Sequence, residues 1–242
     1  MRVGLFAAPL SLDPHLENEF LTSAVLANAF EGLTSLDAAL RVTPALAVSW
    51  DTPGPTTWRF RLRPGARFQD GRPVGARDVV SSLERARSHP RSGVSHYLAD
   101  VVDVRVAGKD AVEIRTQAST SLLLNRLAFV AIVPEGSPAE IRSPIGTGPY
   151  RLATEGFPED LTLVRSDVYW GEVPAEPVVR MLVVTDPARA RAMLVSGDLD
   201  VALAPAPGEA ARLRPEPCCR VVARPSVVVE VLACRVDRPP FD

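Results

Sequence analysis

The sequence lacks any apolar run of about 18 residues, the length that an α-helix needs to cross a bilayer. The stretch from Met1 to Pro9 carries one positive charge and has too short an apolar segment for a secretory signal peptide. We therefore expect an export signal to lie outside the printed chain, or the protein to stay inside the cell.

Lysine is almost absent, because Lys109 is the only one among the 27 lysine and arginine residues. The arginines are scattered and interleaved with acids, and the formal net charge is -2 at pH 7. A nucleic-acid surface needs basic side chains gathered on one face. The sequence therefore predicts no nucleic-acid partner.

Recognisable catalytic and metal-binding motifs are also missing. The three histidines, His15, His89 and His96, do not have the helical spacing of metal ligands. There is no GxSxG motif, and the carboxylates form no evident acid/base pair. The glycine-rich stretch at 146–149 lacks the Lys-Ser/Thr ending of a phosphate loop, which favours a structural turn. We therefore expect no enzyme, no metal and no cofactor.

Cysteine occurs only at Cys218, Cys219 and Cys234. Adjacent cysteines rarely bond each other, although Cys234 could reach one of the pair across a hairpin. Isolated cysteines are usually small buried side chains. We expect free, buried thiols here.

What the sequence does contain is enough apolar material for a packed interior, with 46% hydrophobic and 23% charged residues and a mean hydropathy of +0.08. Single hydrophobic cores stop growing near ~250 residues and usually divide sooner. A chain of 242 residues is therefore expected to form two lobes.

Strand and helix patterns alternate along the chain, which predicts a mixed α/β (α+β) fold with helices packed on a mixed sheet. Strands are expected at residues 2–8, 58–63, 100–106, 111–116, 129–133, 150–153, 161–165, 178–184, 199–203, 219–223 and 226–234. Helices are expected at residues 19–30, 76–88, 187–195 and 208–213, and from Ser119 to about residue 127. The predicted amino-terminal caps are Asn18, Ser119 and Asp186.

Several aromatic residues lie where strands and turns need buried anchors. We expect them to pack in the core, with ligand contact as the alternative. They are Trp50, Trp58, Phe60, Phe68, Tyr150 and Trp170.

Short strings spread over the whole chain resemble one known family when they are taken together. They are Ser11-Leu12-Asp13-Pro14-His15, Phe30-Glu31-Gly32-Leu33, Pro44-Ala45-Leu46-Ala47-Val48-Ser49-Trp50, Trp58-Arg59-Phe60-Arg61-Leu62-Arg63-Pro64-Gly65, Phe68-Gln69-Asp70-Gly71, Ala76-Arg77-Asp78-Val79-Val80, Pro144-Ile145-Gly146-Thr147-Gly148-Pro149-Tyr150, Tyr169-Trp170, Ser196-Gly197-Asp198-Leu199-Asp200 and Pro239-Pro240-Phe241-Asp242. The chain resembles the bacterial extracellular solute-binding proteins of family 5, the oligopeptide/dipeptide-binding type. Members of this family bind oligopeptides, dipeptides, nickel complexes and some sugars or opines.

The resemblance implies a periplasmic-binding-protein-like type II lobe with a smaller α+β lobe inserted into it. Residues 1–36 and 133–242 would form the first lobe, and residues 37–132 the inserted second lobe. In the family the chain then enters a third lobe, which we expect to be missing from this sequence. The ligand of the family is enclosed between the first and third lobes by hinge closure.

The resemblance also implies where a ligand would bind. The loop after the first strand and the stretch after the 196–200 motif line the family's pocket, and part of the second lobe approaches its mouth. The implied ligand-binding residues are Asn18, Glu19, Phe20, Tyr97, Leu203, Ala204 and Pro205, with His96 as an alternative to Tyr97. The stretch at 203–205 is apolar and partly without an amide donor, which weakens the case for hydrogen bonds to a peptide backbone there. For each of these positions, the alternative to ligand contact is that the residue belongs to a surface loop or packs only against its neighbours.

The function implied by the resemblance is the substrate-binding component of an ABC-type importer. Its partners would be a small peptide or similar solute and the importer's membrane subunits, and its location the periplasm or the cell surface. An incomplete first lobe would expose a sheet edge or an apolar patch, which favours self-association. The alternative from another class is a cytoplasmic metabolite-sensing domain of a regulator with a solute-binding-like fold.

Overall fold

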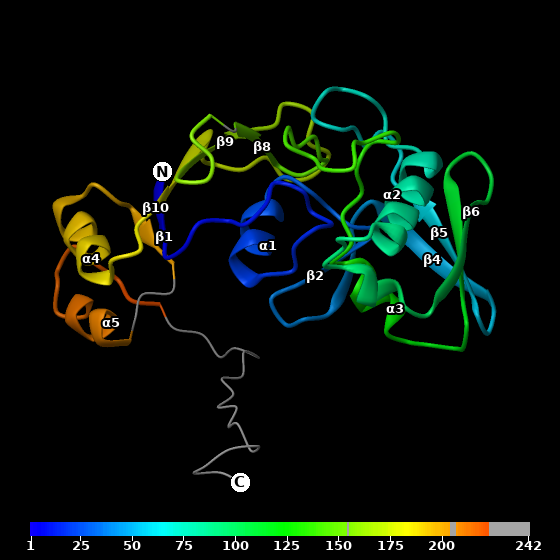
Figure 1. Cartoon of the computed structure of the whole chain (residues 1–242), viewed down its shortest axis with the longest axis horizontal. Helices are drawn as coiled ribbons and strands as arrows, with labels where there is room; N and C mark the ends of the chain where they lie inside the picture. The colour runs from blue at the N-terminus through cyan, green and yellow to red at the C-terminus, as the bar shows by residue number, and fades with distance from the viewer. Residues whose placement is uncertain (154, 204–206, 223–242) are drawn as a thin grey trace, which may run out of the picture.

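The computed structural model describes residues 1–153, 155–203 and 207–222. These residues form two sheet-centred units that lie side by side along the long axis of the molecule (Figure 1). The first unit contains a five-stranded sheet and the second a four-stranded sheet, and helices accompany both. The predicted mixed α/β architecture is therefore confirmed. No helix in this described part of the chain is long and apolar enough to cross a membrane.

The five-stranded sheet combines parallel and antiparallel pairing. Its order is β11 (Val201–Ala202), β1 (Arg2–Leu5), β10 (Val178–Val183), β9 (Asp160–Arg165) and β8 (Tyr150–Ala153). Strand β1 pairs in parallel with β10 and β11, whereas β9 pairs antiparallel with β10 and β8. The β-branched run at 178–184 thus supplies the central strand of this sheet, as its composition predicts.

Three helices belong to the first unit: α1 (Phe20–Leu26), α4 (Pro187–Ser196) and α5 (Pro207–Leu213). Helix α4 begins and ends where the local signals predict. The Asp186 side chain accepts a hydrogen bond from the amide of Ala188 at 2.9 Å, and proline occupies the first helical position. Gly197 then ends the helix with a φ of 80°, a left-handed conformation that glycine adopts without steric cost.

The second unit is built on an antiparallel sheet of order β4 (Ala47–Gly54), β5 (Thr57–Leu62), β7 (Ala111–Thr116) and β6 (Val101–Val106). Its other elements are the small hairpin β2 (Thr34–Leu36) and β3 (Val42–Pro44), helices α2 (Ala76–Ser88) and α3 (Leu123–Leu127), and the 3₁₀ turn η1 (Ser95–Leu98). Strand β5 alternates as predicted: Phe60 and Leu62 are buried, while Arg59 is exposed.

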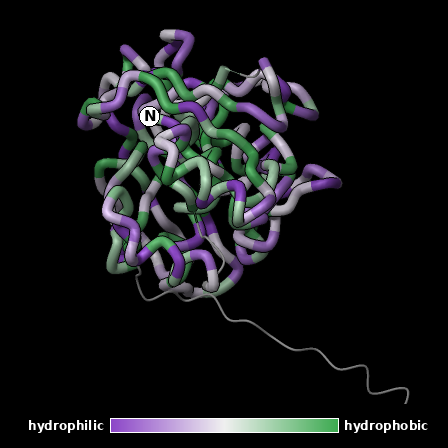
Figure 2. The backbone as a smooth tube through the Cα atoms, turned by 90° about the vertical axis from the view of Figure 1, so that its left-hand side faces the viewer, coloured by the Kyte–Doolittle hydropathy of each residue, from purple (hydrophilic) through white to green (hydrophobic). Residues whose placement is uncertain are grey.

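Each unit has its own hydrophobic core. One core joins α1 to the five-stranded sheet, and the other joins α2 and α3 to the four-stranded sheet. Figure 2, viewed from the α4 end, shows hydrophilic segments on many of the outer loops. Leu33 packs with the second core although it precedes residue 36. The lobe boundaries at residues 36 and 132 stay a prediction.

The two units are tied together by close backbone approach around Gln69. Its side-chain amide donates to the carbonyls of Ala29, Gly148 and Tyr150 at 3.1, 3.1 and 2.7 Å, and its Oε1 accepts from the amide of Gly146 at 3.1 Å. A Cβ on Gly146 would lie 2.0 Å from the Ala29 carbonyl oxygen. The glycines of this motif are therefore required for packing, and the structural turn predicted at 146–149 agrees with this.

A buried charged cluster makes the second connection between the units. The guanidinium of Arg85, on α2, donates from Nη1 to Asp13 Oδ1 at 3.1 Å and contacts His15 Nδ1 at 2.8 Å. Asp13 and His15 are both fully buried. Asp13 also accepts from the amide of Ile141 at 2.9 Å, and His15 Nε2 lies 2.8 Å from the Ala131 carbonyl. The cluster therefore fixes the loop between β1 and α1 against the second unit, whose elements β2 to α3 are inserted between α1 and β8 in the sequence.

The first predicted helix is shorter than expected, and its cap is different. Helix α1 ends at Leu26 rather than Phe30, because the backbone beyond it pairs elsewhere: the Ala29 carbonyl accepts from the amide of Gly148 at 2.9 Å. The cap is Glu19 and not Asn18, since the Glu19 carboxylate accepts from the amide of Leu21.

Three other predictions about local structure are wrong. Residues 129–133 form no strand, because the amide and carbonyl of Val133 bond to the hydroxyl of Ser82 instead of a strand partner. Ser119 caps no helix, since α3 begins only after Leu122, with no side-chain cap. Residues 219–222 form no strand, and the strand expected at 226–234 lies outside the described residues.

The prediction of buried thiols is wrong for two of the cysteines. Cys218 is exposed and Cys219 is only partly buried, because both lie in the turn that follows α5. They are free thiols. Cys234 lies outside the described residues.

The buried cluster predicts that stability depends on pH. Burial is the largest cause that lowers the pKa of His15 from 6.5 to about 4, so the neutral ring is favoured in the folded protein. The unfolded chain binds the proton at higher pH, and the contribution of His15 is therefore complete above pH 6.5 and lost as the pH falls toward 4. We expect the free energy of unfolding, measured by urea titration, to fall by about 3 kcal/mol across this window from this residue.

A His15→Gln variant tests the assignment, because it removes the titrating group and should flatten this part of the pH dependence. The matched control is His96→Gln, since His96 is exposed. Equal slopes for the His15→Gln variant and the unmodified protein would contradict the prediction.

Candidate ligand-binding site

A cleft of about 560 Å³ lies at the junction of the two units. Its walls come from the loop before α1, from α1 itself, from the segment that leads to β2, and from the η1 and post-α3 segments. The lining residues are Pro14, Glu17, Asn18, Phe20, Ser23, Ala24, Leu26, Ala27, Phe30, Glu31, Gly32, Leu36, Val94, Tyr97, Ala128, Phe129 and Ala131. This volume is in the usual range of sites for small ligands.

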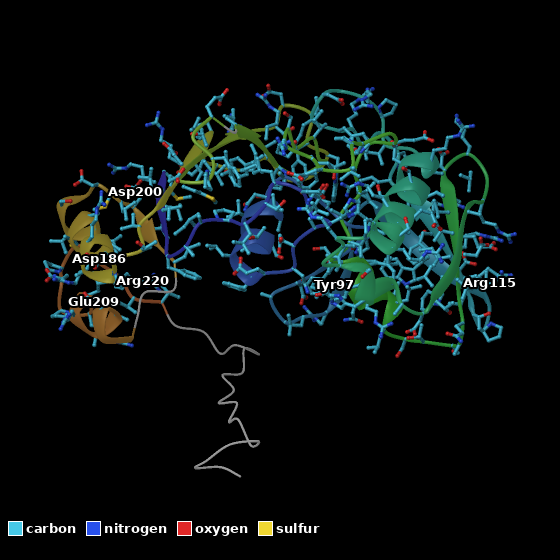
Figure 3. The ribbon with its side chains drawn as sticks, in the orientation of Figure 1. Tyr97, Arg115, Asp186, Asp200, Glu209 and Arg220 are labelled. Atoms are coloured by element: carbon cyan, nitrogen blue, oxygen red, sulfur yellow. The ribbon has the colours of Figure 1, made fainter. Side chains whose placement is uncertain are left out.

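One wall of the cleft is aromatic. The rings of Tyr97 and Phe129 are stacked, with their centroids 5.1 Å apart. The centroid of the His96 ring lies 4.1 Å from that of Tyr97. Phe20 is 66% exposed and Phe129 48% exposed. Figure 3 labels Tyr97 in the second unit, on the side nearer to α1. Large apolar side chains gathered in an open cleft are typical of a ligand or partner site.

The polar groups of the cleft are few. The Tyr97 hydroxyl donates to Asn18 Oδ1 at 3.2 Å, which joins the inserted unit to the loop before α1. Glu17, next to Asn18, is partly buried, and among the described residues its carboxylate has no hydrogen-bond or ion-pair partner. A few placed polar groups in a mainly apolar cleft give a ligand its orientation.

Glu31 forms a second polar point, deeper in the cleft. Its carboxylate accepts from Trp170 Nε1 at 2.9 Å and from the Tyr169 hydroxyl at 3.3 Å. Burial is the largest cause that raises the pKa of Glu31. Burial, together with the neighbouring Glu31 carboxylate, raises the pKa of Tyr169 to about 12. The Arg63 guanidinium lies 3.7 Å above the Trp170 ring and holds it in place.

The structure brings together three of the predicted site residues. Asn18, Phe20 and Tyr97 line the same cleft. Glu19 lies between the first two in sequence, but its side chain turns back to cap α1. Ligand contact by these residues stays a prediction.

Leu203 lies elsewhere. It lines a small cavity of about 40 Å³ between β1, α4 and α5, together with Gly4 and Glu209. Figure 3 places Glu209 at the far end of the molecule from Tyr97. Ala204 and Pro205 lie outside the described residues.

The sequence-based reasoning missed Glu17, Glu31 and Phe129 as cleft residues. Phe129 was expected to be part of a strand, and an aromatic residue in such a pattern indicates core packing. Glu31 stands in a motif that carries the family resemblance, but nothing local in the sequence places it beside Trp170. Of the six expected aromatic anchors, Phe60 and Phe68 are fully buried, whereas Trp170 is only partly buried.

Comparison with known proteins gives consistent results. The family that matches residues 41–242 is described as "Bacterial extracellular solute-binding proteins, family 5 Middle". The glutathione-binding protein GsiB of Salmonella typhimurium is 30% identical over 244 residues, which cover 96% of this chain and 47% of that protein. The chain therefore spans about half the length of the curated relatives it matches.

Solved structures resemble this fold as well. A nickel ABC transporter protein of Bacillus halodurans is 26% identical with a TM-score of 0.79, and the match covers 90% of this chain and 45% of that one. The periplasmic binding protein DppA of Helicobacter pylori, in complex with the peptide STSA, has a TM-score of 0.80 at 20% identity, with 90% and 49% covered. The predicted type II periplasmic-binding-protein-like fold is confirmed.

The contacts of Glu31 predict a graded response to substitution. Glu31→Ala leaves the Trp170 and Tyr169 donors without their acceptor, and we expect the free energy of unfolding to fall by about 1–3 kcal/mol. Glu31→Gln keeps an acceptor oxygen and removes a charge that burial disfavours, so its loss should be under about 1 kcal/mol. Chemical denaturation measures both.

Glu172→Ala serves as the control, because Glu172 is exposed and should change stability by less than about 0.5 kcal/mol. A Glu31→Gln variant as unstable as Glu31→Ala would show that these two hydrogen bonds do not account for the role of the carboxylate.

Proposed function

Because the chain belongs to family 5 of the bacterial extracellular solute-binding proteins, we propose that it is part of the substrate-binding component of an ABC-type importer. The observation that carries this proposal is the open cleft of about 560 Å³, with its stacked Tyr97 and Phe129, in a chain of this family. A receptor of this kind captures its solute and carries out no chemistry on it. The relatives described above are solute-binding transport proteins.

The proposed ligand is a peptide or a similar small solute. DppA of Helicobacter pylori binds a peptide and GsiB binds glutathione, itself a small peptide. The cleft suits such a solute because its apolar wall can pack on a side chain while Asn18 and Glu17 offer hydrogen-bonding groups. The partners would be the membrane subunits of the importer, and the location the periplasm or the cell surface.

Within this proposal the chain supplies one wall of the site. Residues 1–36 and 133–242 are assigned to the first lobe and residues 37–132 to the inserted lobe. Tight sites usually bury 70–90% of a ligand's surface, which one open wall does not achieve. Capture would need a second wall, closed over the first by a hinge.

A peptide titration tests this arrangement. We expect the printed chain to bind di- to pentapeptides more weakly than micromolar, because one wall leaves much of the ligand in water. Calorimetry gives the affinity, and NMR amide shifts locate weak binding at Asn18, Phe20, Tyr97 and Phe129. Micromolar affinity for the chain alone would overturn the one-wall proposal.

Phe129→Ala should reduce the shifts at the other cleft residues, since it removes one face of the aromatic stack. The matched control is Phe6→Ala, because Phe6 is similarly exposed, at 41%, but lies outside the cleft. Equal effects of the two substitutions would argue against the cleft as the ligand site.

We also propose that the chain self-associates through the first sheet. Near β11 the side chains of Phe6, Val201 and Leu203 are 41, 37 and 38% exposed, and β11 itself is only two residues long. Exposed apolar residues beside a short sheet edge favour association. Light scattering should show a mass that rises with concentration, and a monomer mass at all concentrations would contradict this.

A further inference from the structure

The charges of the cleft are all of one sign. Among its lining residues, which all lie in the described part of the chain, are two carboxylates, Glu17 and Glu31, and no lysine, arginine or histidine. In a chain with almost as many basic as acidic residues, this asymmetry is a property of the site rather than of the composition. It gives the cleft a negative potential.

Three arginines on neighbouring segments are paired with carboxylates outside the cleft lining. Arg85 is bound to Asp13, Arg91 pairs with Glu140 at 3.1 Å, and Arg126 pairs with Asp100. Arg63 donates to the neutral Ala45 carbonyl at 2.9 Å and lies over Trp170, and its charge opposes the burial that raises the pKa of Glu31. Arg63 therefore offsets the charge of Glu31, which leaves Glu17 as the cleft carboxylate without a basic partner among the described residues.

The two carboxylates differ in how many hydrogen-bond partners they already have within the protein. Glu31 already accepts hydrogen bonds from Trp170 and Tyr169. Glu17 has no such partner among the described residues, although it is partly buried and adjoins an aromatic wall. A partly buried carboxylate without a partner gains most from a cationic hydrogen-bond donor.

We propose that the cleft selects a solute that carries an ammonium group on an apolar body, and that Glu17 pairs with the ammonium. The inference rests on the proposed function, since it names the chemical class of the solute. The apolar body would lie against the stacked rings of Tyr97 and Phe129, whose faces also attract a cation. A solute that presents a carboxylate to this wall would meet Glu17 and no basic side chain, and would be disfavoured.

Three probes with a shared phenyl body separate charge from apolar contact: 2-phenylethylammonium, 2-phenylethanol and 3-phenylpropionate. We expect NMR titration of the printed chain to give a dissociation constant for the cation about five- to tenfold lower than that of the alcohol. The anion should bind more weakly than the alcohol. High salt should reduce the cation's advantage without changing the affinity of the alcohol.

Glu17→Gln is the decisive variant. It should bring the cation's advantage over the alcohol to about twofold or less while leaving the affinity of the alcohol unchanged. Glu172→Gln removes an exposed acid outside the cleft and should change neither affinity. Phe129→Ala should weaken all three probes in parallel, because it removes apolar contact and no charge.

The outcomes distinguish this inference from the proposed function. Equal affinities for the three probes, or a cation advantage that survives Glu17→Gln, would overturn the cation preference and leave the cleft as a solute site. If no probe shifts the cleft residues of the folded chain, the proposed site fails, and the cation preference fails with it.

Discussion

The contact of Arg85 with Asp13 and His15 is the interaction on which the arrangement of this molecule depends. A buried carboxylate is tolerated only when it is paired and hydrogen-bonded, and here the guanidinium and the Ile141 amide satisfy it. Because Arg85 lies on α2 and Asp13 lies just before α1, one cluster fixes the inserted unit to the first unit. The loop held in this way presents the polar edge of the cleft.

Close backbone packing completes the junction. The Gln69 side chain makes four hydrogen bonds to the backbone of segments far apart in the sequence. Glycine at 146 and 148 lets these segments approach, since a Cβ at either position would collide with the backbone at residues 28 and 29. Two of the family strings quoted from the sequence, the one that contains Gln69 and the one at 144–150, therefore meet at this junction.

Local signals predicted the elements that local physics controls. Helices α2 and α4 lie where periodicity and capping residues place them, and strands β5, β8 and β9 where alternation does. The strand prediction at 129–133 failed because contacts with distant residues decide the structure there. Residues 129–133 have strand-like composition, but Ser82 and His15 take the hydrogen bonds that a strand partner would need. The cleft could be foreseen at Asn18, Phe20 and Tyr97 only through the family resemblance, and Glu17, Glu31 and Phe129 only through the fold.

The aromatic wall combines residues from three segments that are far apart in the sequence: Phe20 from α1, Tyr97 from η1 and Phe129 from the connection after α3. None of these residues belongs to either main sheet. Phe20 and Phe129 are exposed and belong to neither core, so under the proposed function substitutions there would change the cleft wall without removing a core side chain. The side chains that would meet a solute are thus separable from those that hold each unit together.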